Sequence, residues 1–87
     1  MRMLDLTVRV LDLSPKATVE DLTIFFSYCG SIEEIKLNWI GNESKMAYVT
    51  FKQPFAHQAA LLLNDAVILD KQVQIQPLKH FTSIPIK

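Results

Sequence analysis

Three segments of the chain alternate regularly between apolar and polar residues, which is the period of a strand buried on one face. The first segment covers residues 7–13 and carries two valines on its apolar side. The second and third, residues 31–39 and 45–51, are separated by a turn that contains Gly-Asn. Because each of them alternates with period two, we expect the pair to form an antiparallel hairpin.

The pattern toward the C-terminus also indicates extended structure. Apolar residues at 67–69 precede a turn at 70–71 and a last alternating segment, 72–76. In this last strand, Val73 and Ile75 should face inward, and the three glutamines should face outward.

Two other segments have the character of helices. Thr18 followed by Asp21 is typical of a capping box, and apolar residues then recur at helical spacing, which predicts a first helix over 19–28. Gly30 should end this helix. The segment 55–63 is rich in alanine and leucine and predicts a second helix.

The resulting order of elements is βαββαβ, which predicts an α+β, ferredoxin-like sandwich. In this fold a four-stranded antiparallel sheet carries both helices on one face, and its other face is open to solvent or to a partner. We expect the domain to span residues 1–78, with residues 79–87 as a C-terminal tail or the start of a linker.

Composition limits what such a domain can do. The chain has 87 residues, and nine Lys and Arg balance nine Asp and Glu, so its formal net charge is zero. No excess of positive charge is present to attract phosphate at long range, the term that dominates non-specific binding of nucleic acids. Any binding of an anionic polymer must therefore depend on local contacts.

Motifs for chemistry are missing from the sequence. Cys29 is the only cysteine, which predicts a reducing compartment, so we expect an intracellular protein of the nucleus or cytoplasm. The histidines show no metal-ligand spacing relative to this cysteine, and two glycines provide no phosphate-binding loop. We expect no catalysis, no metal, no cofactor and no insertion into a membrane, and we expect the isolated domain to be monomeric.

The predicted strands resemble the RNA recognition motif family over residues 6–78. The family's octamer motif is matched by residues 44–51, and its hexamer motif by residues 8–13. Within the family, residues 17–30 and 47–52 resemble two subgroups. One consists of plant proteins that bind a lipid-transfer protein linked to cell death, and the other of metazoan serine/arginine-rich splicing regulators.

The resemblance implies single-stranded RNA binding on the open sheet face, where up to three aromatic side chains stack on bases. Tyr48 matches one of these aromatics, whereas Met46 and Arg9 replace the other two. Stacking contributes about 1 to 3 kcal/mol per base, so two missing platforms should lower affinity by about 30-fold to about 10,000-fold. The resemblance therefore predicts weak or atypical RNA binding by a degenerate member of the family.

Polar residues near Tyr48 offer some compensation. Arg9 suits stacking or a phosphate contact, Lys36 adds a positive charge beside the same face, and Gln74 and Gln76 suit hydrogen bonds to base edges. The alternative is that these residues only keep an exposed sheet soluble. Tyr48 likewise has the alternative of packing across strands without any ligand.

A second hypothesis is that the domain binds a protein partner and has little or no affinity for RNA. Trp39 and Ile40 form an apolar pair near an edge strand, and tryptophan is favoured in interfaces. Met46 is flexible enough for an adaptable contact on the sheet. Burial of Trp39 under the first helix is the alternative, and Met46 has the alternative of simple packing.

Overall fold

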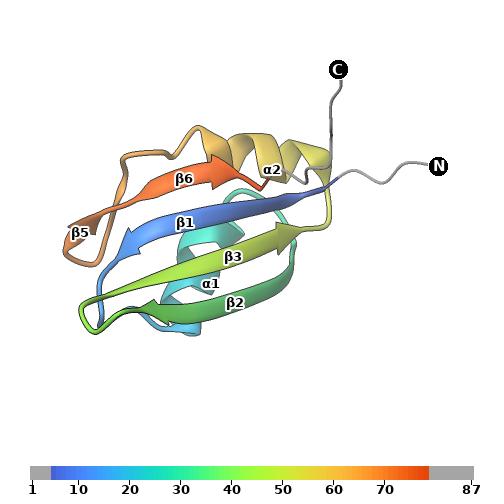
Figure 1. Cartoon of the computed structure of the whole chain (residues 1–87). Helices are drawn as coiled ribbons and strands as arrows, with labels where there is room; N and C mark the ends of the chain where they lie inside the picture. Colours follow the sequence, from blue (N-terminus) through green and yellow to red (C-terminus); the bar gives the residue numbers. More distant parts are fainter. Residues whose placement is uncertain (1–4, 79–87) are drawn as a thin grey trace, which may run out of the picture.

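The computed structural model describes residues 5–78 and contains two helices and a four-stranded antiparallel sheet. Both helices lie against one face of this sheet, and the strands occupy the foreground of Figure 1. The predicted α+β, ferredoxin-like architecture is thereby confirmed. The elements are β1 (Thr7–Leu13), α1 (Val19–Ser27), β2 (Ile32–Ile40), β3 (Ser44–Phe51), α2 (Pro54–Leu61), β4 (Val67–Ile68), β5 (Lys71–Gln72) and β6 (Gln74–Pro77).

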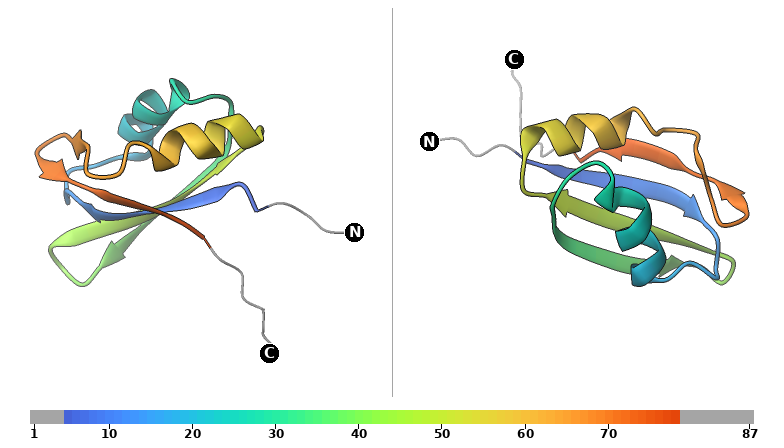
Figure 2. Two further views of the ribbon diagram at one scale, coloured as in Figure 1. Left: turned by 90° about the horizontal axis from the view of Figure 1, so that it is seen from above. Right: turned by 180° about the vertical axis from the view of Figure 1, so that it is seen from behind.

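The order of strands in the sheet is β2-β3-β1-β6, and β4 and β5 form a separate two-stranded ribbon. Seen from above and from behind, the helices cover one side of the sheet and leave the other side bare (Figure 2). β1 and β3 occupy the centre of the sheet, while β2 and β6 form its edges. Side chains on the bare side are therefore placed by their strand and by the alternation along it.

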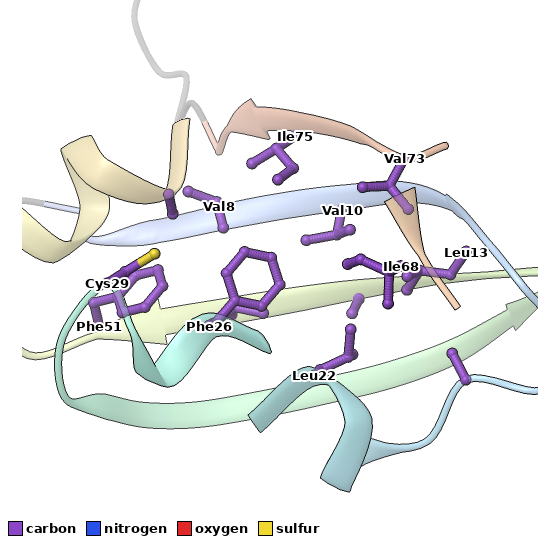
Figure 3. Close-up of a cluster of buried hydrophobic side chains, with 14 of the residues drawn as sticks. Val8, Val10, Leu13, Leu22, Phe26, Cys29, Phe51, Ile68, Val73 and Ile75 are labelled. Carbon is purple, nitrogen blue, oxygen red and sulfur yellow. The ribbon is translucent and has the colours of Figure 1, made fainter. Parts of the chain in front are cut away.

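The hydrophobic core lies between the sheet and the two helices (Figure 3). Phe26 of α1 packs edge-on against Phe51 of β3, with ring centroids 6.1 Å apart. This burial of apolar area holds the helices on one face, because it removes their apolar side chains from water. The fully buried large side chains are Phe26, Phe51, Leu13, Leu22, Val8, Val10, Val49 and Val73.

The N-terminus of α1 carries the capping box that the sequence predicts. The Asp21 backbone N–H donates to Thr18 Oγ1 over 3.1 Å, and the Thr18 backbone N–H donates to Asp21 Oδ2 over 2.9 Å. Two backbone N–H groups that the helix leaves unpaired are thus satisfied. The helix ends at Ser27, one residue earlier than predicted, with Tyr28 as its C-cap.

β1 contains an irregularity that simple alternation does not predict. Val10 pairs with Ala47 and Leu13 pairs with Lys45, so β1 has one more residue than β3 over this stretch. Asp12, with φ of 66°, accommodates the extra residue and accepts a hydrogen bond of 3.1 Å from Gln74 Nε2. As a result of this bulge, Val10 and Leu13 both reach the core.

The segments after β3 differ in detail from the prediction. α2 covers Pro54–Leu61 instead of 55–63. The predicted turn at 70–71 lies one residue earlier, because Ile68 pairs with Lys71 across Leu69 and Asp70. The predicted strand 72–76 is divided between β5 and β6, although Val73 and Ile75 are buried as expected. The predicted tail, 79–87, lies outside the described residues.

Candidate nucleic-acid interface

One row of side chains crosses all four strands on the bare side of the sheet. Lys36 of β2 pairs with Tyr48 of β3, Tyr48 pairs with Arg9 of β1, and Arg9 pairs with Gln76 of β6. Side chains that face each other across antiparallel strands have Cβ atoms about 5 Å apart. The structure therefore brings three other predicted site residues, Lys36, Arg9 and Gln76, into one row with Tyr48.

The other two predicted residues lie in the next row. Met46 precedes Tyr48 by two residues on β3, so its side chain points to the same side of the sheet. Its neighbour on β2 is Asn38. Gln74 of β6 pairs with Leu11 of β1. All six residues predicted for RNA binding thus share one face, in two adjacent rows.

The guanidinium of Arg9 is oriented by β6. Arg9 Nη2 donates to Gln76 Oε1 over 3.0 Å, while Arg9 Nε is buried without a hydrogen-bond partner among the described residues. Within residues 5–78, no carboxylate forms an ion pair with Arg9. The sheet face therefore presents one positive charge beside Tyr48 that is oriented but not neutralised.

A shallow hollow of about 430 Å³ lies beside Tyr48 and extends over β2, β3 and the start of β1. Lys36 Nζ and Glu34 Oε2 stand 3.9 Å apart at its rim, and both side chains are largely exposed. The sequence analysis did not select Thr7, Glu34, Asn38 or Thr50, although the alternation of β1, β2 and β3 places them on this side; Leu78 follows β6. The lining residues are Thr7, Glu34, Lys36, Asn38, Tyr48, Thr50 and Leu78.

Lys45, at the glycine position of the octamer motif, lies on the opposite side of the sheet from Tyr48. Its Nζ donates to the backbone carbonyl of Ala17 over 2.8 Å and stands 4.8 Å from the centroid of the Trp39 ring. This lysine therefore links the β2–β3 hairpin to the segment before α1. It supplies no charge to the bare face.

The residues predicted for a protein interface do not form one surface. Trp39 is not buried under α1: it is 55% exposed and lies on the same side of the sheet as Lys45. Ile40, 49% exposed, follows it in the same strand, pairs with Ser44 and points to the other side of the sheet, which it shares with Met46. The expected apolar pair is thus divided between the two faces by the alternation of β2.

Three further features of the described residues concern metal binding, the cysteine thiol and membrane-spanning helices. Among residues 5–78, no cluster of three or more His, Cys, Asp or Glu side chains is arranged to hold a metal ion. Cys29 is buried in the core, and burial raises the pKa of its thiol, so the reactive thiolate is disfavoured. None of the described helices is long and apolar enough to cross a membrane.

Comparison with known families accounts for this geometry. A model of the RNA recognition motif matches residues 8–74. The chain belongs to this family. The matched residues begin in β1, include both helices, β2 and β3, and end at the first residue of β6. The match covers Arg9, Met46 and Tyr48, which the structure places on the bare face of the sheet of this RNA recognition motif.

The chain spans about a quarter of the length of the curated relatives it matches. Protein vip1 of Schizosaccharomyces pombe is 37% identical over 68 residues, which cover 78% of this chain and 26% of that protein. Binding partner of ACD11 1 of Arabidopsis thaliana is 41% identical over 76 residues, covering 87% and 28% respectively. The solved structure of Pes4 RRM3 has a TM-score of 0.84 at 21% identity, over 91% of this chain and 98% of that one, and shows the same fold.

Proposed function

We propose that this RNA recognition motif is a non-enzymatic module that binds single-stranded RNA weakly, through the bare face of its sheet. The observation that carries the proposal is the row Lys36, Tyr48, Arg9 and Gln76, which sets one aromatic ring between two positive charges. A base stacked on Tyr48 would have a cation on either side, within reach of its phosphates or of its polar edge. We expect this binding to take place in the nucleus or cytoplasm.

The proposed binding is weak because one stacking platform takes the place of three. Stacking contributes about 1 to 3 kcal/mol per base, and the chain has no net positive charge to compensate at long range. Gln74 and Gln76 add hydrogen-bonding capacity, but both amides already contact neighbours, Asp12 and Arg9 respectively. Replacing these two hydrogen bonds with hydrogen bonds to RNA therefore changes the binding free energy little.

An NMR titration tests the proposal. The labelled chain is titrated at low salt with a pool of short single-stranded RNAs, and the amides of Arg9, Met46, Tyr48 and Gln74 are followed. Shifts confined to this face are expected. Tyr48→Ala should weaken binding by about 5-fold to about 140-fold, whereas Tyr48→Phe, which keeps the ring, should retain it. Absence of Tyr48-dependent shifts up to millimolar RNA would reject the proposal.

Protein binding is a second candidate function, and the exposed Trp39 favours it. A tryptophan that is 55% exposed at the end of a hairpin, with Lys45 Nζ against its ring, is a preformed interface anchor. One relative of this chain is named as a binding partner of another protein. For this candidate, Trp39→Ala should abolish capture of a protein from lysate that Tyr48→Ala still captures. The captured protein must then bind the purified chain directly with the same dependence on Trp39, or the candidate is excluded.

A further inference from the structure

We propose that the base stacked on Tyr48 is a guanine, read by Glu34 and Lys36. This inference rests on the RNA-binding function proposed above and specifies which base the same face prefers. Both residues line the hollow beside the tyrosine and project from β2, the edge strand of the sheet. A base that covers the ring and extends over the hollow therefore presents its edge to this pair.

The positions of the two charges follow from the strand pairing. Lys36 is the direct cross-strand neighbour of Tyr48, and Glu34 is the neighbour of Thr50 on the same side of the sheet. The ammonium and the carboxylate are 3.9 Å apart, and their side chains are 65% and 57% exposed. One donor and one acceptor thus stand side by side at the rim and remain accessible to a ligand.

The chemistry of the pair matches guanine better than the other bases. A carboxylate only accepts hydrogen bonds, through two oxygens, and an ammonium only donates. The Watson–Crick edge of guanine places two neighbouring donors, N1–H and the 2-amino group, beside the acceptor O6. Both oxygens of Glu34 and the ammonium of Lys36 are therefore satisfied by one edge, in a charge-assisted, bidentate arrangement.

Each of the other bases leaves part of this pair unsatisfied. Adenine and cytosine offer one amino group as a donor on that edge, with acceptors beyond it. Uracil offers a single N–H between two carbonyl oxygens, which a carboxylate repels. Glu34 therefore contributes discrimination, because it penalises bases that place an acceptor against it.

Glu34 is otherwise a cost to RNA binding. A carboxylate on a face that receives phosphates lowers affinity for every sequence, and the neighbouring Lys36 offsets this only in part. A residue that selects guanine and a residue that only solubilises the sheet thus differ in a measurable way. Replacing the first removes a preference, whereas replacing the second changes affinity equally for all bases.

The experiment compares hexameric RNAs that differ at one position. Oligouridylate carrying a single central guanine, adenine, cytosine or uracil is titrated into the chain, with inosine as a fifth base that lacks only the 2-amino group. We expect the guanine oligomer to bind about 5-fold to about 10-fold more tightly than the others, the lower part of the range for a bidentate contact. The inosine oligomer should lose most of this advantage.

Two variants with the same change in charge separate a specific role from a general one. Glu34→Gln should abolish the preference for guanine and leave binding of the all-uridine oligomer equal or tighter. Glu33→Gln, at an exposed neighbour that does not line the hollow, should keep the preference. If Tyr48-dependent binding is equal for all bases, or if the preference survives Glu34→Gln, the guanine assignment is wrong while RNA binding stands. If no Tyr48-dependent binding occurs, both proposals fail.

Discussion

Replacement of Arg9 by phenylalanine should convert this sheet into a stronger RNA-binding face. Arg9 stands at the hexamer position where the family stacks a base, and it is the direct cross-strand neighbour of Tyr48. Arg9→Phe would therefore place a second ring beside the first. Arg9→Ala is the matched control, because it removes the same guanidinium without adding a platform.

The expected magnitude combines a gain and a loss. A new stacking platform adds about 1 to 3 kcal/mol, so Arg9→Phe should bind about 5-fold to about 140-fold more tightly than Arg9→Ala. A lost phosphate contact reduces the salt slope of a single strand by about 0.7, which is about 2.5-fold in affinity between about 50 and about 200 mM salt. Both variants lose that contact equally, so the difference between them isolates the ring.

The folded state should tolerate the change. Both variants lack Arg9 Nη2, which donates a hydrogen bond to Gln76 Oε1 in the native chain. Because Gln76 is only partly buried, water replaces the lost donor. The buried Nε without a partner also disappears. Urea unfolding should confirm that the free energy of unfolding falls by no more than about 1 kcal/mol.

Fluorescence anisotropy with a labelled oligonucleotide, repeated at several salt concentrations, measures both the affinity gained from the added ring and the salt slope lost with the phosphate contact. If Arg9→Phe binds no more tightly than Arg9→Ala at any salt concentration, a base does not reach this part of the sheet, and the reasoning from the cross-strand row is wrong. If the salt slope is the same for the native chain and both variants, Arg9 makes no phosphate contact.

Three further predictions concern the folded state. Gly30→Ala should destabilise the chain by about 1 to 3 kcal/mol in urea unfolding, because the added Cβ would stand 2.5 Å from Ala56 Cβ; the second change Ala56→Gly should then recover part of the loss. Thr18→Ala should lower the free energy of unfolding by about 1 kcal/mol, because the Asp21 backbone N–H loses Thr18 Oγ1 as its acceptor; an unchanged value in urea unfolding would contradict this. Burial raises the pKa of the Cys29 thiol above its unfolded value of about 8.5, so the unfolded chain loses this proton at a lower pH than the folded chain. The contribution of the protonated thiol to the free energy of unfolding is therefore present below about pH 8.5 and is lost as pH rises through the folded pKa. Cys29→Ala should flatten the alkaline part of the stability curve measured by urea unfolding, and an unchanged curve contradicts this.

The order of elements and the open face could be predicted from the sequence because their signals are local. A period of two along β1 and β3 determines that Val8 faces the helices and Tyr48 faces away. The capping box at Thr18 and Asp21 determines where α1 begins, since both residues act within one turn. The same period places Lys45 on the helix side, because it lies two residues before Ala47.

Only the tertiary structure decided which distant residues meet on that face. Lys36, Tyr48, Arg9 and Gln76 come from four different strands, and no local period specifies their registers. Those registers follow from packing of the whole core and, in β1, from the bulge at Asp12 that turns Leu13 inward. The exposure of Trp39 was decided in the same way, because the extent of α1 over β2 determines what the helix covers.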